Sequence, residues 1–301
     1  MGDTRRKKVN LHIGAHKTAT TFIQKVLRAS KDSLTGHGIK YVPTQNVRKN
    51  VTHGLRAHKN RGISRAATVT RIREYVESRF PGDYTTLVIS EENLVGNCRE
   101  LYTKSDLYPN IKERLQLVAE ALQAYEVDVY FCVRGYVDFF PSAYCEFLRH
   151  NDFTTFETFL GGVDPAKDYW VGVIDSICDI FGADRTHVWA YEDFRKHSER
   201  IMAELVSSAD VRLSYDIDDA RLSMSDMSIR ALTKLDEILS PAETSRLVKA
   251  VTLAFPKGDG YAGFFPWDDT QRAFWSGKYQ GELDALKQRE GLFLELQKSD
   301  S

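Results

Sequence analysis

The sequence VNLHIGAHKTATTFIQ (residues 9–24) predicts a strand, a polar loop and a helix in direct succession. A β-branched, apolar run reaches Gly14, the loop carries Lys17 and Thr18, and apolar residues at helical spacing follow from Thr20 onward. The first N–H groups of a helix have no partner within it and lie at the positive end of its dipole, so such a junction attracts an anion. We therefore expect the loop to bind the phosphate of a nucleotide-like donor.

Length and composition favour a soluble α/β protein without a dominant charge. The chain has 301 residues, and its 41 basic and 42 acidic residues nearly balance, so the overall charge indicates neither nucleic acid nor an anionic membrane as a partner. No segment approaches the roughly 18 consecutive apolar residues of a transmembrane helix, and residues 1–10 lack the apolar stretch of a signal peptide. The four cysteines form no CxxC pair. These features predict a cytoplasmic protein with reduced thiols.

Strands alternate with helices through most of the chain, which is typical of a parallel sheet covered on both faces. Further strands are expected at residues 39–42 (IKYV), 85–90 (TTLVIS), 127–133 (VDVYFCV) and 187–191 (HVWAY). Helices are expected at residues 20–27, 111–122, 137–148, 170–181, 229–239 and 279–297. We predict a three-layer α/β/α fold with a mainly parallel central sheet. It forms a single domain over residues 1–301, with a core at about 9–195 and a mainly helical C-terminal portion at about 196–301.

Charged residues follow two of the expected strands at the edge where parallel sheets bind ligands. Glu91 and Glu92 follow residues 85–90, and Arg134 ends the strand at 127–133. The helix beyond Arg134 contains Pro141, which is tolerated only in a first turn, with Asp138 as the expected cap. Ser142 is then expected to face the strand end near Arg134.

A kinase or GTPase loop is the first alternative for the opening motif. The fingerprint GxxxxGK[ST] requires a glycine before the lysine, but Gly14 to Thr18 reads GAHKT, which lacks that glycine and two further residues of the loop. Phosphoryl transfer also needs an acidic residue for Mg²⁺, whereas the strongest strand ends in Arg134. The eight histidines show no metal-ligand spacing, so we predict no metal site.

With these residues in view, the stretch HIGAHKTATTFIQ (residues 12–24) resembles the 5′-phosphosulfate loop of sulfotransferases that use 3′-phosphoadenosine 5′-phosphosulfate (PAPS), which is usually written with a KTGTT core. In that family an arginine at a strand end and a serine about eight residues later bind the 3′-phosphate of the donor. Arg134 and Ser142 in CVRGYVDFFPSAY match this pattern. LVISEENL and WAYEDF are similar to the bacterial branch of the family. The resemblance extends from about residue 9 to 194, and more weakly over 223–239.

The resemblance implies a P-loop-like fold and an enzyme that moves a sulfuryl group from PAPS to an acceptor hydroxyl, leaving adenosine 3′,5′-bisphosphate (PAP). Lys17 would bind the phosphosulfate and stabilise the leaving phosphate. Ala19 replaces the usual loop glycine, and its methyl group requires a negative φ there. The alternative for Thr20 is that it only caps the helix. The donor-binding residues implied are Gly14, Ala15, His16, Lys17, Thr18, Ala19, Thr20, Thr21, Arg134 and Ser142.

The acceptor hydroxyl must lose its proton, so a general base is expected within hydrogen-bond reach. Glu92 is the first choice, because members of the family use a glutamate or a histidine. Glu91, His16 and His53 remain alternatives. Either glutamate could also be a helix-start residue without a chemical role.

The related bacterial enzymes imply a carbohydrate, a glycolipid or a small alcohol as acceptor. The basic segment 53–73 either receives an anionic group or is a solvated surface. Aromatic residues between 261 and 267 either stack on a sugar ring or pack in the core. Lys257, in KGDGYAG, faintly resembles a donor-binding residue of cytosolic sulfotransferases, but the stretch also reads as a simple turn. Two other functions stay open: a P-loop small-molecule kinase that uses Mg-ATP, and a relative that binds the nucleotide without catalysis.

Overall fold

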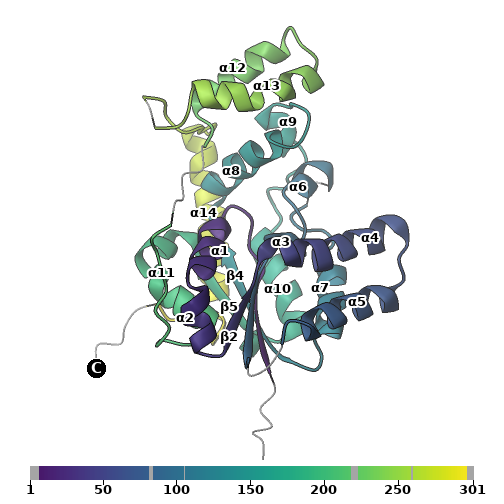
Figure 1. Ribbon diagram of the computed structural model, residues 1–301. Coiled ribbons are helices and arrows are strands. Elements are labelled where there is room, and N and C mark those ends of the chain that lie inside the picture. Colours follow the sequence, from purple (N-terminus) through teal and green to yellow (C-terminus); the bar gives the residue numbers. More distant parts are fainter. Residues whose placement is uncertain (1–6, 81–83, 105, 218–222, 259, 297–301) are drawn as a thin grey trace, which may run out of the picture.

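The computed structural model describes residues 7–80, 84–104, 106–217, 223–258 and 260–296. Within them five strands form one parallel sheet in the order β2-β3-β1-β4-β5 (Figure 1). The strands are β1 (Lys8–His12), β2 (Ile39–Val42), β3 (Thr86–Ser90), β4 (Glu126–Val133) and β5 (Thr186–Ala190). The predicted α/β class and parallel central sheet are confirmed.

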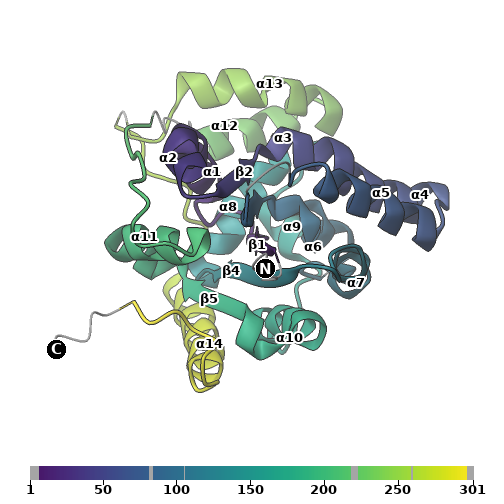
Figure 2. The ribbon, with the colours of Figure 1, turned by 60° about the horizontal axis from the view of Figure 1, so that its bottom comes forward.

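Helices cover both faces of this sheet, with α1, α2 and α11 on one face and α7 and α10 on the other (Figure 2). The helices are α1 (Thr20–Ala29), α2 (Lys31–Gly36), α3 (Thr44–Val47), α4 (His53–Arg61), α5 (Arg65–Glu77), α6 (Arg99–Lys104), α7 (Ile111–Ala121), α8 (Tyr136–Leu148), α9 (Phe156–Leu160), α10 (Tyr169–Phe181), α11 (Tyr191–Val206), α12 (Asp226–Asp236), α13 (Pro241–Ala254) and α14 (Asp269–Lys287). Short helical turns are η1 (Arg48–Thr52), η2 (Glu92–Leu94) and η3 (Ala183–Arg185). None of the described helices is long and apolar enough to cross a bilayer.

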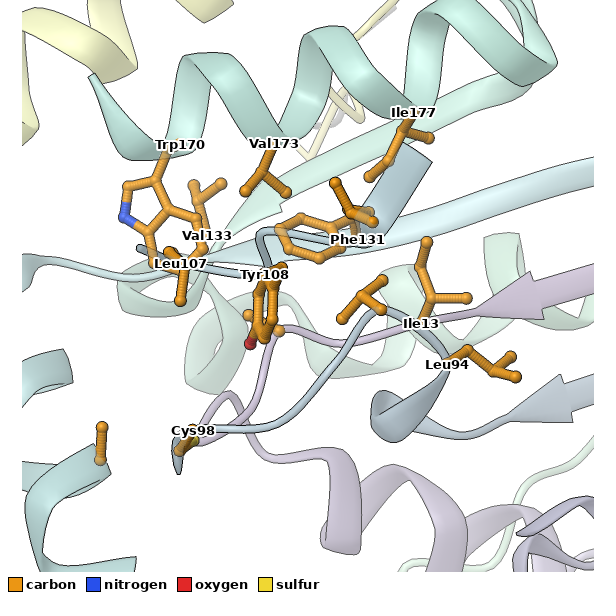
Figure 3. Packing of buried hydrophobic residues seen from close by; sticks show 14 of the residues in the cluster. Ile13, Leu94, Cys98, Leu107, Tyr108, Phe131, Val133, Trp170, Val173 and Ile177 are labelled. Atoms are coloured by element: carbon orange, nitrogen blue, oxygen red, sulfur yellow. The ribbon is translucent and has the colours of Figure 1, made fainter. Parts of the chain in front are cut away.

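The alternation of side chains along each strand builds two separate cores. In β4, Val129, Phe131 and Val133 point to the face covered by α7 and α10, whereas Tyr130 and Cys132 point to the face covered by α1 and α11. Figure 3 shows the first core, where Trp170 and its neighbours on α10 pack over the end of β4. Because both faces are buried, β4 reads as a continuous apolar run in the sequence.

The sheet places the loop after β1 at its topological switch point. The chain leaves β1 toward β2, while β4 lies on the other side of β1, so the carboxyl end of β1 opens into a crevice where ligands of such sheets bind. Beyond the strand, Ala15 N–H donates to the Cys132 carbonyl at 3.1 Å, and Cys132 N–H donates to the Gly14 carbonyl at 2.7 Å. These bonds hold the loop against the end of β4, close to Arg134.

The boundaries of the predicted elements agree closely with the structure, except near the C-terminus, whereas α9 and α11 were not predicted. The last helix is expected at residues 279–297, but α14 starts at Asp269 and ends at Lys287. Its start is set by Asp268, which caps the helix and forms a capping box with Gln271. This local signal lies outside the apolar periodicity from which the helix was predicted. The end of that prediction, residue 297, and the N-terminal residues 1–6 lie outside the described residues.

Pro141 lies in the interior of α8, not in its first turn as the sequence predicts. The N-cap of α8 is Gly135, so Asp138 and Pro141 are both inside the helix, and Asp138 is not the cap. Because proline has no N–H, the carbonyl of Val137 loses the hydrogen bond from the fourth residue along the chain. The indole Nε1 of Trp267 donates to that carbonyl at 2.8 Å instead. A distant tryptophan therefore makes the interior proline tolerable.

Because the Trp267 indole supplies the hydrogen bond that Pro141 cannot donate, we expect the stability effects of substitutions at these two residues to be coupled. Trp267→Phe leaves the Val137 carbonyl unpaired and is expected to lower the free energy of unfolding by about 1–3 kcal/mol. In a Pro141→Ala background the new N–H of residue 141 can bond to that carbonyl, so the hydrogen-bond part of this cost is expected to disappear. A double-mutant cycle by urea unfolding measures the difference, and loss of ring packing cancels within the cycle. Equal costs in the two backgrounds would contradict this coupling.

Candidate functional site

A cavity of about 450 Å³ opens at the carboxyl edge of the sheet, a size usual for small-molecule sites. Its wall is built from the loop after β1, the start of α1, the end of β4, one face of α8, the start of α11, and residues 223, 224, 257, 263 and 264. The predicted site residues that line it are His16, Lys17, Ala19, Thr20, Thr21, Glu92, Arg134 and Ser142. Gly14, Ala15 and Thr18 do not line it.

The buried residues of the loop hold its shape from inside. Thr18 Oγ1 donates to the Ala15 carbonyl at 2.6 Å, and Thr20 Oγ1 donates to the same oxygen at 3.2 Å. The N-cap of α1 is Ala19, and its cap has no side-chain hydrogen bond, so Thr20 is not a helix cap. Gly14 has φ +117°, and a Cβ there would lie 3.3 Å from the His16 nitrogen. This position therefore suits only glycine.

The backbone at Ala19 contradicts the sequence-based expectation. A negative φ is expected there, but φ is +61°, in the left-handed region, and Lys17 has φ +63°. For a residue with a Cβ this conformation is strained, and it persists because the surrounding loop is held by the Thr18 and Thr20 hydroxyls.

Replacing Ala19 with glycine is expected to relieve this strain. Ala19→Gly should raise the free energy of unfolding by about 0.5–1 kcal/mol, the relief of strain being partly offset by the greater freedom of glycine in the unfolded chain. The matched control is Ala203→Gly within α11, which should lower stability by a similar amount. Denaturant unfolding of both variants checks the prediction, and a loss of stability in both would contradict it.

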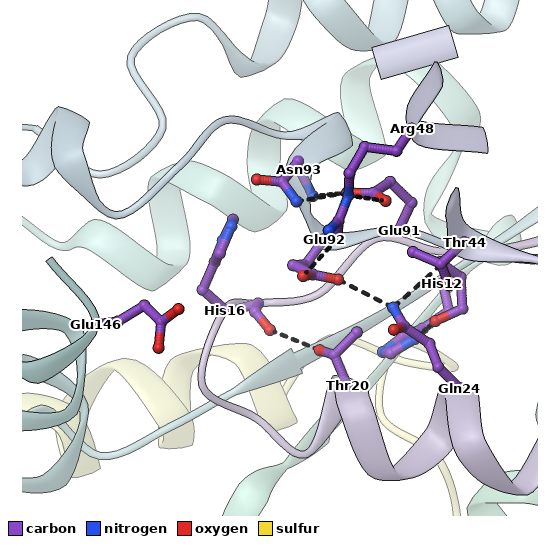
Figure 4. Close-up of polar contacts among 12 residues, drawn as sticks. His12, His16, Thr20, Gln24, Thr44, Arg48, Glu91, Glu92, Asn93 and Glu146 are labelled. Atoms are coloured by element: carbon purple, nitrogen blue, oxygen red, sulfur yellow. Dashed lines mark hydrogen bonds and ion pairs between the residues drawn. The ribbon is translucent and has the colours of Figure 1, made fainter. Parts of the chain in front are cut away.

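Glu91 and Glu92 follow β3 but have different surroundings (Figure 4). Glu91 is fully buried, its Oε2 lies 2.9 Å from Arg48 Nε, and it accepts the N–H of Asn93. Burial, together with the neighbouring charge of Glu92, raises the pKa of Glu91. Glu92 lies on the cavity wall and accepts from Gln24 Nε2 at 3.0 Å and from Arg48 at 3.2 Å. Of the two carboxylates, only Glu92 can meet a ligand in the cavity.

The two histidines considered as bases also differ in position. His16 lines the cavity but is only 9% exposed, and its Nδ1 lies 2.9 Å from the Tyr108 hydroxyl. Burial lowers the pKa of His16 to about 4, so its ring is neutral near pH 7. His53 is exposed at the start of α4 and does not line the cavity.

Arg134 joins the end of β4 to the loop after β1. Its guanidinium donates to the Lys17 carbonyl at 2.6 Å and lies over the ring of Tyr191, 4.4 Å from the ring centre. Both contacts fix the arginine at the cavity wall, which it shares with Ser142. The structure thus brings the predicted arginine and serine to the same cavity as the lysine loop.

Several lining residues were not identified from the sequence. Glu146 lies 3.2 Å from Lys17 Nζ, and Arg149 is the C-cap residue of α8. Both share the helical face of Ser142, at i+4 and i+7, so the spacing could have indicated them. Arg195 and Tyr191 come from α11, and no sequence signal links them to the loop.

The basic segment 53–73 does not contribute to the cavity. Arg65 pairs with Glu120 at 2.8 Å, and His58 lies 3.6 Å from Glu113, so two members face acidic residues of α7. Solvated surface, one of the two alternatives, therefore describes segment 53–73 better than a ligand site does.

Near the C-terminus, Lys257 does line the cavity although its sequence reads as a turn.

The aromatic stretch near residue 264 divides between cavity and core. Phe264 lines the cavity and contacts the rings of Tyr144 and Phe156, whereas Phe265 is about half exposed. Trp267 packs on Phe156 at 5.1 Å between ring centres. Only Phe264 is positioned to meet a ligand. Within the described ranges, no group of three or more His, Cys, Asp or Glu side chains is arranged to hold a metal ion.

Comparisons with known proteins give structural likeness only. No protein-family model matches the sequence, and no curated protein matches it. The chain is similar in structure to a sulfotransferase from Alicyclobacillus acidocaldarius, with a TM-score of 0.42 and 14% identity over 82% of this chain and 97% of that one. It is also similar to retinol dehydratase in complex with androsterone and inactive cofactor PAP, with a TM-score of 0.38 and 10% identity over 93% and 82% of the two chains. Retinol dehydratase with retinol and PAP gives 0.37 and 11% over the same shares. At these values the likeness assigns no substrate to the present chain.

Proposed function

We propose that the protein is a PAPS-dependent sulfotransferase that transfers a sulfuryl group to the hydroxyl of an acceptor. One observation carries the proposal: a single cavity is lined by two cationic side chains, Lys17 from the loop before α1 and Arg134 from the end of β4, with Ser142 of α8 on the same wall. PAPS carries an anionic bridge at one end of its nucleoside and a 3′-phosphate at the other. A donor with two separated anionic groups suits this arrangement.

The residues present fit such a donor. At the start of α1 the first backbone N–H groups are free of helical partners, and Thr21 is exposed on the cavity wall. The Nε of Arg134 is buried, and no atom of the described residues accepts its hydrogen. A phosphate oxygen would satisfy this donor with a charge-assisted bond.

Each side chain has a separate role in the transfer. PAPS, when bound, supplies the sulfuryl group. Lys17 stabilises negative charge on the phosphate that leaves, which is most effective where the charge is held in place in advance. Glu92 accepts the proton of the attacking hydroxyl, a role supported by its place on the cavity wall. Glu91 is buried in its pairing with Arg48, and His16 remains the alternative base.

A carbohydrate or glycolipid is the acceptor class we propose. The cavity wall offers carboxylates, three guanidinium groups and the ring of Phe264, which suit hydroxyl groups and one sugar face. We also propose that residues 1–301 act as one domain in the cytoplasm. Leu232 and Val248 from the C-terminal helices join the core of the sheet, and all four cysteines are free thiols.

Calorimetry with two nucleotides tests the function. The protein is expected to bind PAP more tightly than ADP-Mg, because PAP carries the 3′-phosphate that Arg134 and Ser142 would hold. A preference for ADP-Mg would contradict the proposal and favour a small-molecule kinase. Sulfation of a panel of saccharides, glycolipids and alcohols with labelled PAPS then identifies the acceptor. PAP binding without any sulfated product would indicate a relative that binds the nucleotide without catalysis.

Arg134→Ala is expected to lower PAP affinity by about 1.5–3 kcal/mol, through loss of a charge-assisted contact with the 3′-phosphate. The control ligand is AMP, which lacks that phosphate and should bind the variant and the parent alike. Since Arg134 also donates to the Lys17 carbonyl, an equal loss for AMP would show that the arginine only supports the loop. Unchanged PAP affinity would show that Arg134 does not contact the donor.

A further inference from the structure

Glu146 contacts the lysine on which the donor site depends. Its Oε2 lies 3.2 Å from Lys17 Nζ, and both side chains are about one-fifth exposed, at 20% and 21%. The contact joins α8 to the loop after β1, and both residues line the same cavity. Lys17 is therefore already engaged by a carboxylate at the place where an anionic group of a ligand is expected.

Glu146 has a histidine and an arginine as neighbours besides Lys17. His150 Nε2 lies 3.5 Å from Oε1, and Arg149 Nε lies 4.0 Å from Oε2, and both residues directly follow the end of α8. Glu146 can therefore release Lys17 and still lie beside positive charge. Partly exposed ion pairs are weak, so breaking this one costs little compared with a contact to a doubly charged phosphate bridge.

Lysine suits such an exchange of partners. Its ammonium is a compact charge on a flexible four-carbon stem, with no preference for a single direction of approach. The backbone of Lys17 is held by Arg134 through its carbonyl, so the side chain can turn while the loop stays in place.

From these contacts we infer that Glu146 is a positioning residue of the donor site. It holds Lys17 across the cavity when no donor is bound, and the anionic bridge of the donor competes with it for the same ammonium. The inference rests on the proposed function. The donor must displace Glu146 from Lys17, and this displacement lowers donor affinity. The other carboxylates of the cavity do not lower donor affinity in this way.

Calorimetry with PAP tests this competition. Glu146→Gln keeps the size of the side chain and removes its charge, and it is expected to tighten PAP binding by about two- to fivefold. In a Lys17→Met background the same substitution should change PAP affinity much less, because the competition is lost. A general effect of removing negative charge would persist in that background. Asp138→Asn, which removes another carboxylate from the same wall, is the matched control and should give a smaller change.

A second measurement follows Lys17 itself without any nucleotide. Brief treatment with acetic anhydride, read by peptide mass spectrometry, reports how accessible the Lys17 amine is. Glu146→Gln should increase acetylation of Lys17 severalfold, and Asp138→Asn should leave it unchanged. Thermal unfolding of each variant confirms that it is folded.

The outcomes separate this inference from the proposed function. If the parent binds PAP and Glu146→Gln binds it equally, the inference is overturned and the proposed function stands. If the parent does not bind PAP, the proposed function fails, and with it the competition. The acetylation rate of Lys17 in Glu146→Gln then tests the contact itself. A rate equal to that of the parent would show that Glu146 does not restrain Lys17, and a higher rate would support the restraint.

Discussion

Replacing Lys17 with methionine is expected to lower the rate of sulfation by about 10²–10³-fold, equivalent to about 2.7–4 kcal/mol of transition-state stabilisation. Methionine keeps the length of the side chain but removes the charge that would stabilise the leaving phosphate. The effect should fall mainly on kcat, because this charge grows as the S–O bond breaks. The measurement is steady-state transfer from labelled PAPS to the acceptor identified in the panel.

The control for Lys17 is Lys31→Met. Lys31 is an exposed lysine at the start of α2 that does not line the cavity, so its loss should leave the rate unchanged. Lys17→Arg separates charge from geometry, since a planar guanidinium cannot replace a compact ammonium without adjustment. If Lys17→Met transfers sulfuryl groups at the parental rate, the assignment of this lysine to the leaving phosphate is wrong.

Glu282→Ala is expected to lower the free energy of unfolding by about 3–5 kcal/mol, the largest stability effect of any single change considered. Glu282 on α14 is only 3% exposed, and it accepts the Tyr136 hydroxyl at 2.6 Å and the N–H groups of Trp170 and Val171 at 2.7 and 3.1 Å. The two N–H groups belong to the first turn of α10. Alanine would leave three buried donors without this acceptor and open a void beside them.

Urea unfolding measures this loss, with Glu237→Ala as control. Glu237 is an exposed glutamate next to α12, and its pair with Lys234 should contribute at most about 0.5 kcal/mol. A loss for Glu282→Ala no larger than for Glu237→Ala would contradict the role of Glu282. Glu282→Gln keeps one oxygen as acceptor and should cost less than alanine.

The pH dependence of the Glu282→Gln variant has a definite sign. Burial raises the pKa of Glu282 above its ordinary value of 4.5. A carboxyl whose pKa is raised by folding contributes stability that is complete below the unfolded pKa and is lost as the pH rises through the folded pKa. Glutamine does not titrate, so the stability advantage of the parent over Glu282→Gln should be largest near pH 4 and smaller at pH 7.

Glu282 also connects the C-terminal helix to the proposed donor site. The indole Nε1 of Trp170, whose backbone Glu282 holds, donates to the Arg134 carbonyl at 2.9 Å. Glu192 accepts the Gly135 N–H at 2.9 Å and the Tyr279 hydroxyl at 2.8 Å. The end of β4 is thus tied on two sides to α14, so the C-terminal helix supports the position of Arg134.

Local patterns in the sequence were sufficient to predict the strands, several of the helices and the loop. The strand at 39–42 and the helix at 111–122 follow from side-chain periodicity, because burial on one or two faces selects apolar residues at the period of the element. The glycine and lysine of the loop, and the arginine at the end of β4, were also recognised. These features depend on residues close together in the chain.

The sequence by itself therefore determined the parallel α/β fold, the loop and the strand-end residues, since each is encoded within one short segment. Only the tertiary structure decided the partners across the cavity. Glu146 meets Lys17, and Trp267 supports Pro141, because strand order and helix packing bring distant segments together. The left-handed backbone of Ala19 was missed for the same reason, since the surrounding loop imposes a conformation against the residue's own preference. Such contacts are set by the three-dimensional arrangement, and no spacing within a single segment records them.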